Sequence, residues 1–258
     1  RVDDFVREKY VKDKLLAMKK NHKTSLEKEQ KKNESTIARC VGMTIETRPD
    51  YADKKIGNFL LTLGCTRVEL GIQSLENKKL EAIERGHTVD DSVKAIRTLK
   101  DLGFKLNFHM MIGLPGWNQK DDIKSLENLY IDERFRPDML KIYPCMVIEG
   151  TKLHTRFDKK EYIPLKTKDA VKIISSFLPN VPEYARIMRV QRDIPTNATI
   201  AGVDRTNLRQ YIDKLGTRSR DIREREAGNV FRKTGKTPEK IDFLIKEYDA
   251  SQGKEFFV

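Results

Sequence analysis

Polar and ionisable side chains, which could bind a ligand or transfer a proton, recur near the ends of apolar runs before residue 150. They are Glu46 with Arg48, Glu69 with Gln73, His109, and Lys141 with Tyr143. In parallel β/α proteins, ligands bind where the strands end, because the loops that follow meet at one edge of the sheet. We therefore expect these polar side chains to rim a common cavity.

Two neighbouring features could also serve a bound ligand. Gly113 and Gly116 of the segment GLPG would let the backbone approach a ligand closely, since neither carries a side chain. Arg85 follows the second apolar run, and its guanidinium could reach an anionic group such as a carboxylate. These residues extend the candidate site beyond the strand ends.

Each of these residues also has a purely structural interpretation. Glu46 and Arg48 could form an ion pair, and Gln73 could be a capping or core hydrogen bonder. His109 among methionines could be a satisfied core histidine, and Lys141 could extend its amine to solvent. Only the coincidence of these residue types at successive strand ends favours a functional site.

The apolar runs predict strands that alternate with helices. We expect strands over 39–47, 68–74, 105–116 and 139–148. Thr88 as N-cap and Gly103 after the last turn predict a helix between the second and third strands. Such alternation is typical of a parallel sheet of βα units, so the predicted fold class is α/β.

Four strands are too few to close a barrel. We therefore predict a partial TIM-type (β/α) barrel whose missing strands precede Arg1. Past residue 150 we expect helices over 167–178, 204–215 and 241–258, and a strand over 185–193. The predicted parts are a lysine-rich helix and connector (1–37), the partial barrel (38–150) and a basic α/β extension that faces RNA (151–258).

The charge of the chain indicates a polyanionic partner. Lys and Arg number 51 against 39 Asp and Glu, which gives a net charge of +12. The segment 205–240 holds eleven Lys and Arg against five Asp and Glu, so its net charge is +6. Such clustering favours nucleic acid, although an exposed face with local salt bridges such as Arg223–Glu226 would explain it too. The candidate RNA-binding residues are Arg189, Arg192, Arg205, Arg209, Arg218, Arg220, Arg223 and Arg225.

The cysteines predict no metal site in this chain. Cys40, Cys65 and Cys145 stand far apart and form no CxxC pair, which argues against a self-contained zinc or iron–sulfur centre. So few cysteines in a long chain favour a reducing compartment, the cytosol. The sequence holds no run of 18 apolar residues and no secretory h-region near its start, so no membrane contact is expected.

Several segments resemble one family, the catalytic subunit of Elongator. They are TIETRPDY (44–51), LGCTRVELGIQS (63–74), RGHTV (85–89), GLPG (113–116), FRPDMLKIYP (135–144), RVQRDIP (189–195) and RDIREREAG (220–228). This family, the tRNA uridine carboxymethyl synthases, joins a radical S-adenosylmethionine (SAM) domain to an acetyltransferase domain. GLPG stands where eukaryotic members commonly read DLPN, which indicates the archaeal or bacterial branch. The family's cluster cysteines and acetyltransferase domain have no counterpart here, so we expect a central and C-terminal piece of the radical domain that is inactive alone.

The resemblance implies cofactors, a substrate and residue roles. The intact enzyme would use a 4Fe–4S cluster and SAM to make a radical that takes hydrogen from the acetyl group of acetyl-CoA. The acetyl radical would add to carbon 5 of the wobble uridine in the tRNA anticodon. Glu46, Gln73, Arg85 and His109 would bind SAM, and Lys141 with Tyr143 would be catalytic. The arginines would hold the anticodon stem-loop, and other Elongator subunits would be partners in a eukaryote.

Two alternatives remain open. The same radical chemistry could act on a small molecule such as a porphyrinogen, but this leaves the +6 segment unexplained. A non-enzymatic basic RNA-binding module would explain the charge, but it leaves the polar residues at four successive strand ends unexplained.

Overall fold

The computed structural model describes residues 9–14, 24–191, 199–205, 207–237, 240 and 242–258, which fall into two compact units. The first unit, Arg1–Val41, contains helix α2 (Leu26–Asn33). Ser25 caps this helix by accepting a hydrogen bond from the Lys28 amide. All eight of its residues are described and none is buried, so α2 is a solvent-exposed helix.

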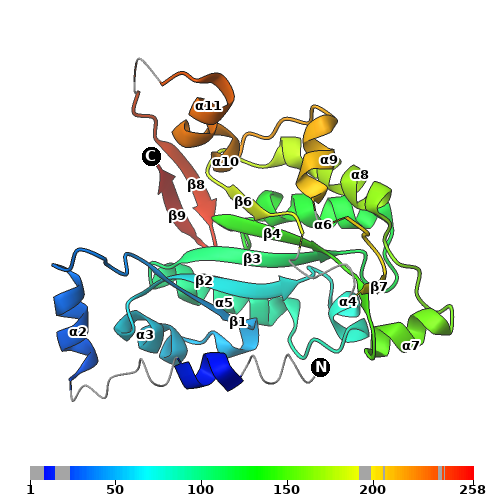
Figure 1. The fold of residues 1–258 in the computed structure, drawn as a ribbon, viewed down its shortest axis with the longest axis horizontal. Helices are drawn as coiled ribbons and strands as arrows, with labels where there is room; N and C mark the ends of the chain where they lie inside the picture. Colours follow the sequence, from blue (N-terminus) through cyan, green and yellow to red (C-terminus); the bar gives the residue numbers. More distant parts are fainter. Residues whose placement is uncertain (1–8, 15–23, 192–198, 206, 238–239, 241) are drawn as a thin grey trace. The chain divides into compact units, whose positions relative to one another are not determined.

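A parallel sheet forms the centre of the second unit, Gly42–Val258 (Figure 1). Within the described residues it has five strands in the order β1-β2-β3-β4-β6, and every neighbouring pair is parallel. The strands are β1 (Met43–Thr47), β2 (Cys65–Gln73), β3 (Lys105–Ile112), β4 (Met139–Pro144) and β6 (Arg186–Arg189). The α/β fold with a central parallel sheet is thereby confirmed, and an open five-stranded sheet is consistent with a partial barrel.

One face of this sheet is apolar and covered by helices. Leu70, Phe108 and Ile142 are fully buried and belong to a single hydrophobic core. The same core takes residues from five α-helices: α3 (Lys54–Thr62), α5 (Val89–Asp101), α6 (Gln119–Ile131), α8 (Thr167–Phe177) and α9 (Leu208–Lys214). Because side chains alternate along a strand, the residues between these apolar positions lie on the opposite face.

The helix between β2 and β3 shows how local sequence fixes the layout. Thr88 and Asp91 form a reciprocal capping box at the start of α5, and Gly103 follows its end with a φ of +82°. The apolar residues Ile96 and Leu99 of this helix are fully buried against the sheet. The predicted helix limits are therefore confirmed.

Short elements connect the strands and helices of this unit, and the last of them form its C-terminal part. They are η1 (Pro49–Tyr51), α4 (Asn77–Ala82), β5 (Val147–Ile148), α7 (Lys152–Asp158), η2 (Leu178–Asn180), β7 (Thr199–Ala201), α9 (Leu208–Lys214), α10 (Ile222–Arg225), α11 (Ala227–Thr234), β8 (Lys246–Ala250) and β9 (Gly253–Phe257). β5 and β7 pair antiparallel, and so do β8 and β9. Among the described residues, no helix is long and apolar enough to cross a bilayer.

The sheet continues past residue 150, where the sequence suggested a boundary. β6 pairs with β4 in parallel, with Met139 opposite Arg186 and Leu140 opposite Ile187. Ile187 is fully buried and joins the same core as the first four strands. The residues after 150 thus complete the sheet that the earlier strands begin.

The predicted helix over 241–258 is wrong, because part of this segment forms the β8–β9 hairpin. Ser251 and Gln252 form its turn with φ values of +50° and +68°, and the Ser251 amide donates to the Glu133 carbonyl at 2.7 Å. The Tyr248 ring stacks on Tyr184 with 3.9 Å between centroids. Contacts with distant residues therefore stabilise strands in this segment, where the local sequence pattern favours a helix.

Candidate active site on the open face of the sheet

Polar residues from neighbouring strands share the face that lies opposite the helices. Glu46 pairs with Glu69 in register, and Glu69 pairs with Asn107. Two residues further along β3, His109 pairs with Lys141 of β4. A spacing of two places all five side chains on the same face, so the register itself builds the cluster.

Glu69 is the centre of this cluster. Its Oε2 lies 2.7 Å from Nε2 of His109 and forms an ion pair with the Lys141 ammonium. Nδ1 of His109 lies 3.2 Å from Oε1 of Glu46. The side chain of Glu46 is 65% exposed and that of Glu69 only 7%. The cluster therefore runs from solvent at Glu46 to a buried carboxylate at Glu69.

The environment of Glu69 keeps its carboxylate ionised. Burial favours the neutral acid, but hydrogen bonds from His109 and Lys141 and the charge of Lys141 outweigh it and lower the pKa of Glu69 to about 2. The ring of Tyr143 meets the His109 ring edge-on, with centroids 5.4 Å apart. The structure thus brings Glu46, His109, Lys141 and Tyr143 together around a residue to which the sequence gave no specific role.

Arg85 and Gln73 form a second polar group around Gly71. The Arg85 guanidinium donates from Nη2 to the Gly71 carbonyl at 3.3 Å, while its buried Nε meets no hydrogen-bond partner among the described residues. A Cβ at position 71 would lie 2.3 Å from Nη2 of Arg85 and 2.9 Å from Nε2 of Gln73. The missing side chain of Gly71 therefore leaves the space that both polar groups occupy.

The surroundings of Arg85 lower the pKa of its guanidinium. Burial and the nearby Arg48 guanidinium lower the pKa of Arg85, while Asp50 and Glu46 oppose that change. Arg48 itself donates from Nε to Asp50 at 2.9 Å. The structural ion pair of Arg48 is therefore with Asp50, and Glu46 faces His109 instead.

The GLPG segment is held by the protein rather than open for close approach. The Gly113 amide donates to Asp122 at 2.7 Å, and the Tyr162 hydroxyl donates to the Gly113 carbonyl at 2.6 Å. Gly113 has a φ of +74°, which a glycine adopts without strain. Beside this segment, Met111 and Leu114 line an apolar cavity of about 420 Å³.

The residues present fit one of the two expected cofactors. The Arg85 guanidinium, with its unpartnered Nε and with Nη2 close to Gly71 as the Gln73 amide is, suits the carboxylate and polar groups of SAM. A 4Fe–4S cluster does not fit the cysteines of this chain, because no two of them are closely spaced in sequence and Cys65 and Cys145 lie in separate hydrophobic clusters. Glu46, Glu69 and His109 are the one group of three potential metal ligands among the described residues, and Lys141 already neutralises Glu69.

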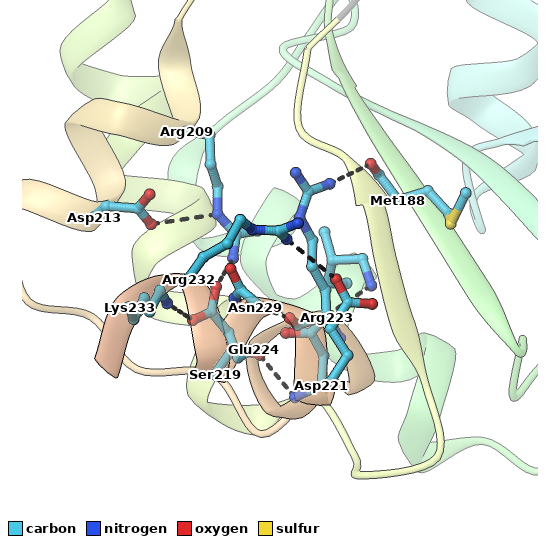
Figure 2. A network of polar contacts seen from close by, with 12 residues as sticks. Met188, Arg209, Asp213, Ser219, Asp221, Arg223, Glu224, Asn229, Arg232 and Lys233 are labelled. Atoms are coloured by element: carbon cyan, nitrogen blue, oxygen red, sulfur yellow. Dashed lines mark hydrogen bonds and ion pairs between the residues drawn. The ribbon is translucent and has the colours of Figure 1, made fainter. Parts of the chain in front are cut away.

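The predicted arginine track is largely committed to internal contacts (Figure 2). Arg209 bridges Asp213 and Glu224, and Arg223 donates to the Met188 carbonyl at 3.0 Å. Hydrogen bonds from Lys233 and Arg209 outweigh burial and lower the pKa of Glu224. These contacts tie α9 and α10 to β6, so the structural interpretation of Arg209 and Arg223 is supported.

The other arginines differ in their surroundings. Arg220 pairs with Glu183, and Arg225 donates to the carbonyls of Arg220 and Glu183. The proposed Arg223–Glu226 pair is replaced, since Glu226 contacts Arg186 at 2.7 Å. Arg205 and Arg218 are exposed and form no ion pair with a described residue, and Arg192 lies outside the described residues. Arg189, Arg209 and Arg223 line a polar hollow of about 330 Å³ beside β6.

Sequence reasoning missed the role of Glu69 and the presence of Asn107. Both are polar residues inside strands that are otherwise apolar, and Asn107 is fully buried. A polar residue two positions before His109 is the signal that would have identified Asn107, because both side chains must lie on one face.

Comparisons with known proteins agree with this architecture. The Radical SAM superfamily model matches residues 4–129, and the Radical_SAM C-terminal domain model matches residues 137–216. The tRNA uridine(34) acetyltransferase of Methanocaldococcus jannaschii is 44% identical over 255 residues, which cover 96% of this chain and 47% of that protein. Elongator complex protein 3 of Homo sapiens is 37% identical over 234 residues, which cover 88% of this chain and 42% of that protein.

One solved structure matches most of the fold. It is the archaeal Methanocaldococcus infernus Elp3 with an N-terminal deletion, with a TM-score of 0.87, 43% identity, and coverage of 91% of this chain and 57% of that chain. The fold and the two family models define the class: the chain belongs to the radical SAM superfamily. Within that class, it is homologous to Elongator complex protein 3 and the tRNA uridine(34) acetyltransferases across their radical SAM region. The chain spans about half the length of the curated relatives it matches.

Proposed function

We propose that this chain is the radical SAM part of an enzyme that carboxymethylates carbon 5 of the wobble uridine in tRNA, with acetyl-CoA as co-substrate. The observation that carries the proposal is the convergence of Glu46, Glu69, His109 and Lys141 on one open sheet face. That face belongs to a chain whose relatives are named for tRNA uridine(34). A small-molecule substrate would leave the net charge of +12 without a partner.

SAM is proposed to bind between the two polar groups of this face. Arg85 would hold its carboxylate through the unpartnered Nε, with Gln73 beside it. Glu46 and His109 would face its other polar groups from β1 and β3. When bound, SAM supplies the radical chemistry that gives the superfamily its name. The cluster does not fit the residues of this chain, so we derive no step that passes through it.

Lys141 and Tyr143 are the proposed catalytic residues. Glu69 forms an ion pair with Lys141 at the centre of the face, and Tyr143 packs edge-on against His109. Tyr143 is 8% exposed, so its phenol works in a site that excludes most water. We propose that it delivers a proton or an electron beside the uridine, with Lys141 as the nearby positive charge.

The tRNA and the cellular setting complete the proposal. The exposed Arg218, which forms no ion pair with a described residue, would contact a phosphate of the anticodon stem-loop, because guanidinium groups bind phosphate well. The chain has only three cysteines, which suits a reducing compartment such as the cytoplasm. In a eukaryotic source, other Elongator subunits would be partners.

The test is nucleoside analysis by mass spectrometry. The protein expressed anaerobically from its complete gene is incubated with tRNA, SAM, acetyl-CoA and a reductant. We expect 5-carboxymethyluridine at position 34, and about tenfold or greater loss in Tyr143→Phe, in line with the size of general acid effects. Tyr51→Phe is the matched control, because Tyr51 is 62% exposed and lies off the sheet face. An unmodified wobble uridine with the wild-type protein would contradict the proposal.

A further inference from the structure

A basic groove lies between α8 and α9, away from the open sheet face and outside the arginine network of Figure 2. Its volume is about 710 Å³. The residues that line it combine three cations with an aromatic ring: Lys168 and Lys172 of α8, Arg205, and Tyr211 of α9. Such a combination is what single-stranded nucleic acids require, since cations follow the phosphates and a ring stacks on a base.

The cations of this groove are free to meet an anion. Lys168, Lys172 and Arg205 are exposed, and none forms an ion pair with a described residue. The one carboxylate in the lining, Asp204, accepts a hydrogen bond from the Thr167 hydroxyl. The Lys214 ammonium lies 5.6 Å from the centroid of the Tyr211 ring and adds a further positive charge beside the groove.

Two electrostatic effects within α8 disfavour lysines at these positions. Lys168 lies in the first turn of α8, where the positive end of the helix dipole disfavours a cation. Lys172 follows one turn later, and like charges four residues apart repel each other. An anion bound beside Lys168 and Lys172 would offset both effects.

The groove is held in place by buried structure. Gln191 is 7% exposed; its Nε2 donates to the Arg205 carbonyl and its Oε1 accepts from the Leu208 amide at 3.3 Å. These bonds tie Arg205 and the start of α9 to Gln191, two residues after the end of β6. Helix α9 lines both this groove, through Tyr211, and the arginine hollow, through Arg209.

We propose that the groove between α8 and α9 binds a single-stranded segment of RNA, with phosphates on Lys168, Lys172 and Arg205 and a base stacked on Tyr211. This inference rests on the proposed tRNA substrate and adds a contact surface that is separate from the site of chemistry.

The test measures tRNA and short oligouridylate affinity over a series of salt concentrations. In Lys168→Ala/Lys172→Ala we expect about tenfold weaker binding and a salt slope that is smaller by about 1.4, because each lost phosphate contact removes about 0.7 for single strands. Tyr211→Leu should weaken binding about fivefold or more without changing the slope, and Tyr211→Phe should bind as wild type, because stacking needs only the ring.

The matched control is Lys54→Ala/Lys55→Ala, which removes the same charge from exposed positions on α3. It should bind tRNA within about twofold of wild type, since salt largely screens an exposed charge that lies more than a Debye length from the bound RNA. If Lys168→Ala/Lys172→Ala and this control bind tRNA with equal affinity, the groove proposal is overturned and the proposed function stands. If wild-type protein fails to bind tRNA at low salt, the proposed function fails and the groove assignment falls with it.

Discussion

Glu69 shows how one buried carboxylate organises residues from three strands. It accepts from His109 of β3 and Lys141 of β4 while it lies opposite Glu46 of β1. The pKa of Glu69 is lower in the folded protein than the ordinary value of 4.5, so the ionised carboxylate stabilises the fold. This stabilisation is fully present at pH values above 4.5. That stabilisation is lost as the pH falls through about 2. The sequence could place Glu46 and Glu69 at strand ends, but only the register decides which one is buried.

Glu69→Gln tests this linkage. At neutral pH the variant should be less stable than wild type, because Lys141 loses its charged partner in a largely buried position. The difference in free energy of unfolding should shrink as the pH falls from 4.5 towards 2, where wild type loses the same charge. Urea denaturation at several pH values measures it, with the exposed Glu81→Gln as control. A difference that is constant with pH would contradict the assigned pKa.

At the scale of elements, the sequence predicted the strands of the sheet well and the C-terminal hairpin wrongly. β2 and β3 are strands in which most positions are buried, and their apolar residues are dense enough for the local sequence pattern to predict them. The hairpin instead depends on distant partners, such as Tyr184 for Tyr248 and Glu133 for Ser251, that no local pattern reveals. The same limit applies to the site. Strand ends could be found, whereas the pairing of Arg209 with Glu224 could not.

Strand β2 offers a direct test of the proposed SAM site through Gly71. In Gly71→Ala the new methyl group would overlap the Arg85 guanidinium, which is the far end of a flexible side chain and can move. We expect a folded protein with SAM affinity reduced about tenfold, because loss of one charge-assisted hydrogen bond has about this effect. Isothermal titration calorimetry measures the affinity. Gly228→Ala is the control, since a Cβ there meets nothing within 4 Å. Equal SAM affinity in both variants would exclude Arg85 from the site.

On the scale of the whole second unit, the β8–β9 hairpin joins parts that are distant in sequence (Figure 1). Glu255 pairs with Lys100 at the end of α5, and the Asp249 carbonyl accepts from Arg136 after α6. Lys246 contacts Glu183 just before β6 at 3.1 Å. These contacts bind the C-terminal segment to both halves of the sheet, so the unit should unfold as one.

Tyr248→Ala tests this cooperativity. The loss of the Tyr184 stack and of its packing should lower the free energy of unfolding by about 2–3 kcal/mol, slightly less than for a fully buried aromatic residue. Urea denaturation followed by far-UV circular dichroism and tyrosine fluorescence should give one coincident transition, while SAM affinity stays unchanged. Two separate transitions would show that the hairpin folds independently of the sheet.

The order of the sheet has a consequence for barrel closure. β1 stands at one edge, so within the described residues its outer backbone groups have no strand to pair with. Any strand that extends the sheet on this side must run alongside Met43–Thr47, about 4.8 Å away. Such a neighbour would place its own side chains next to Glu46, the solvent-facing end of the polar cluster, and would thereby turn an open rim into an enclosed wall.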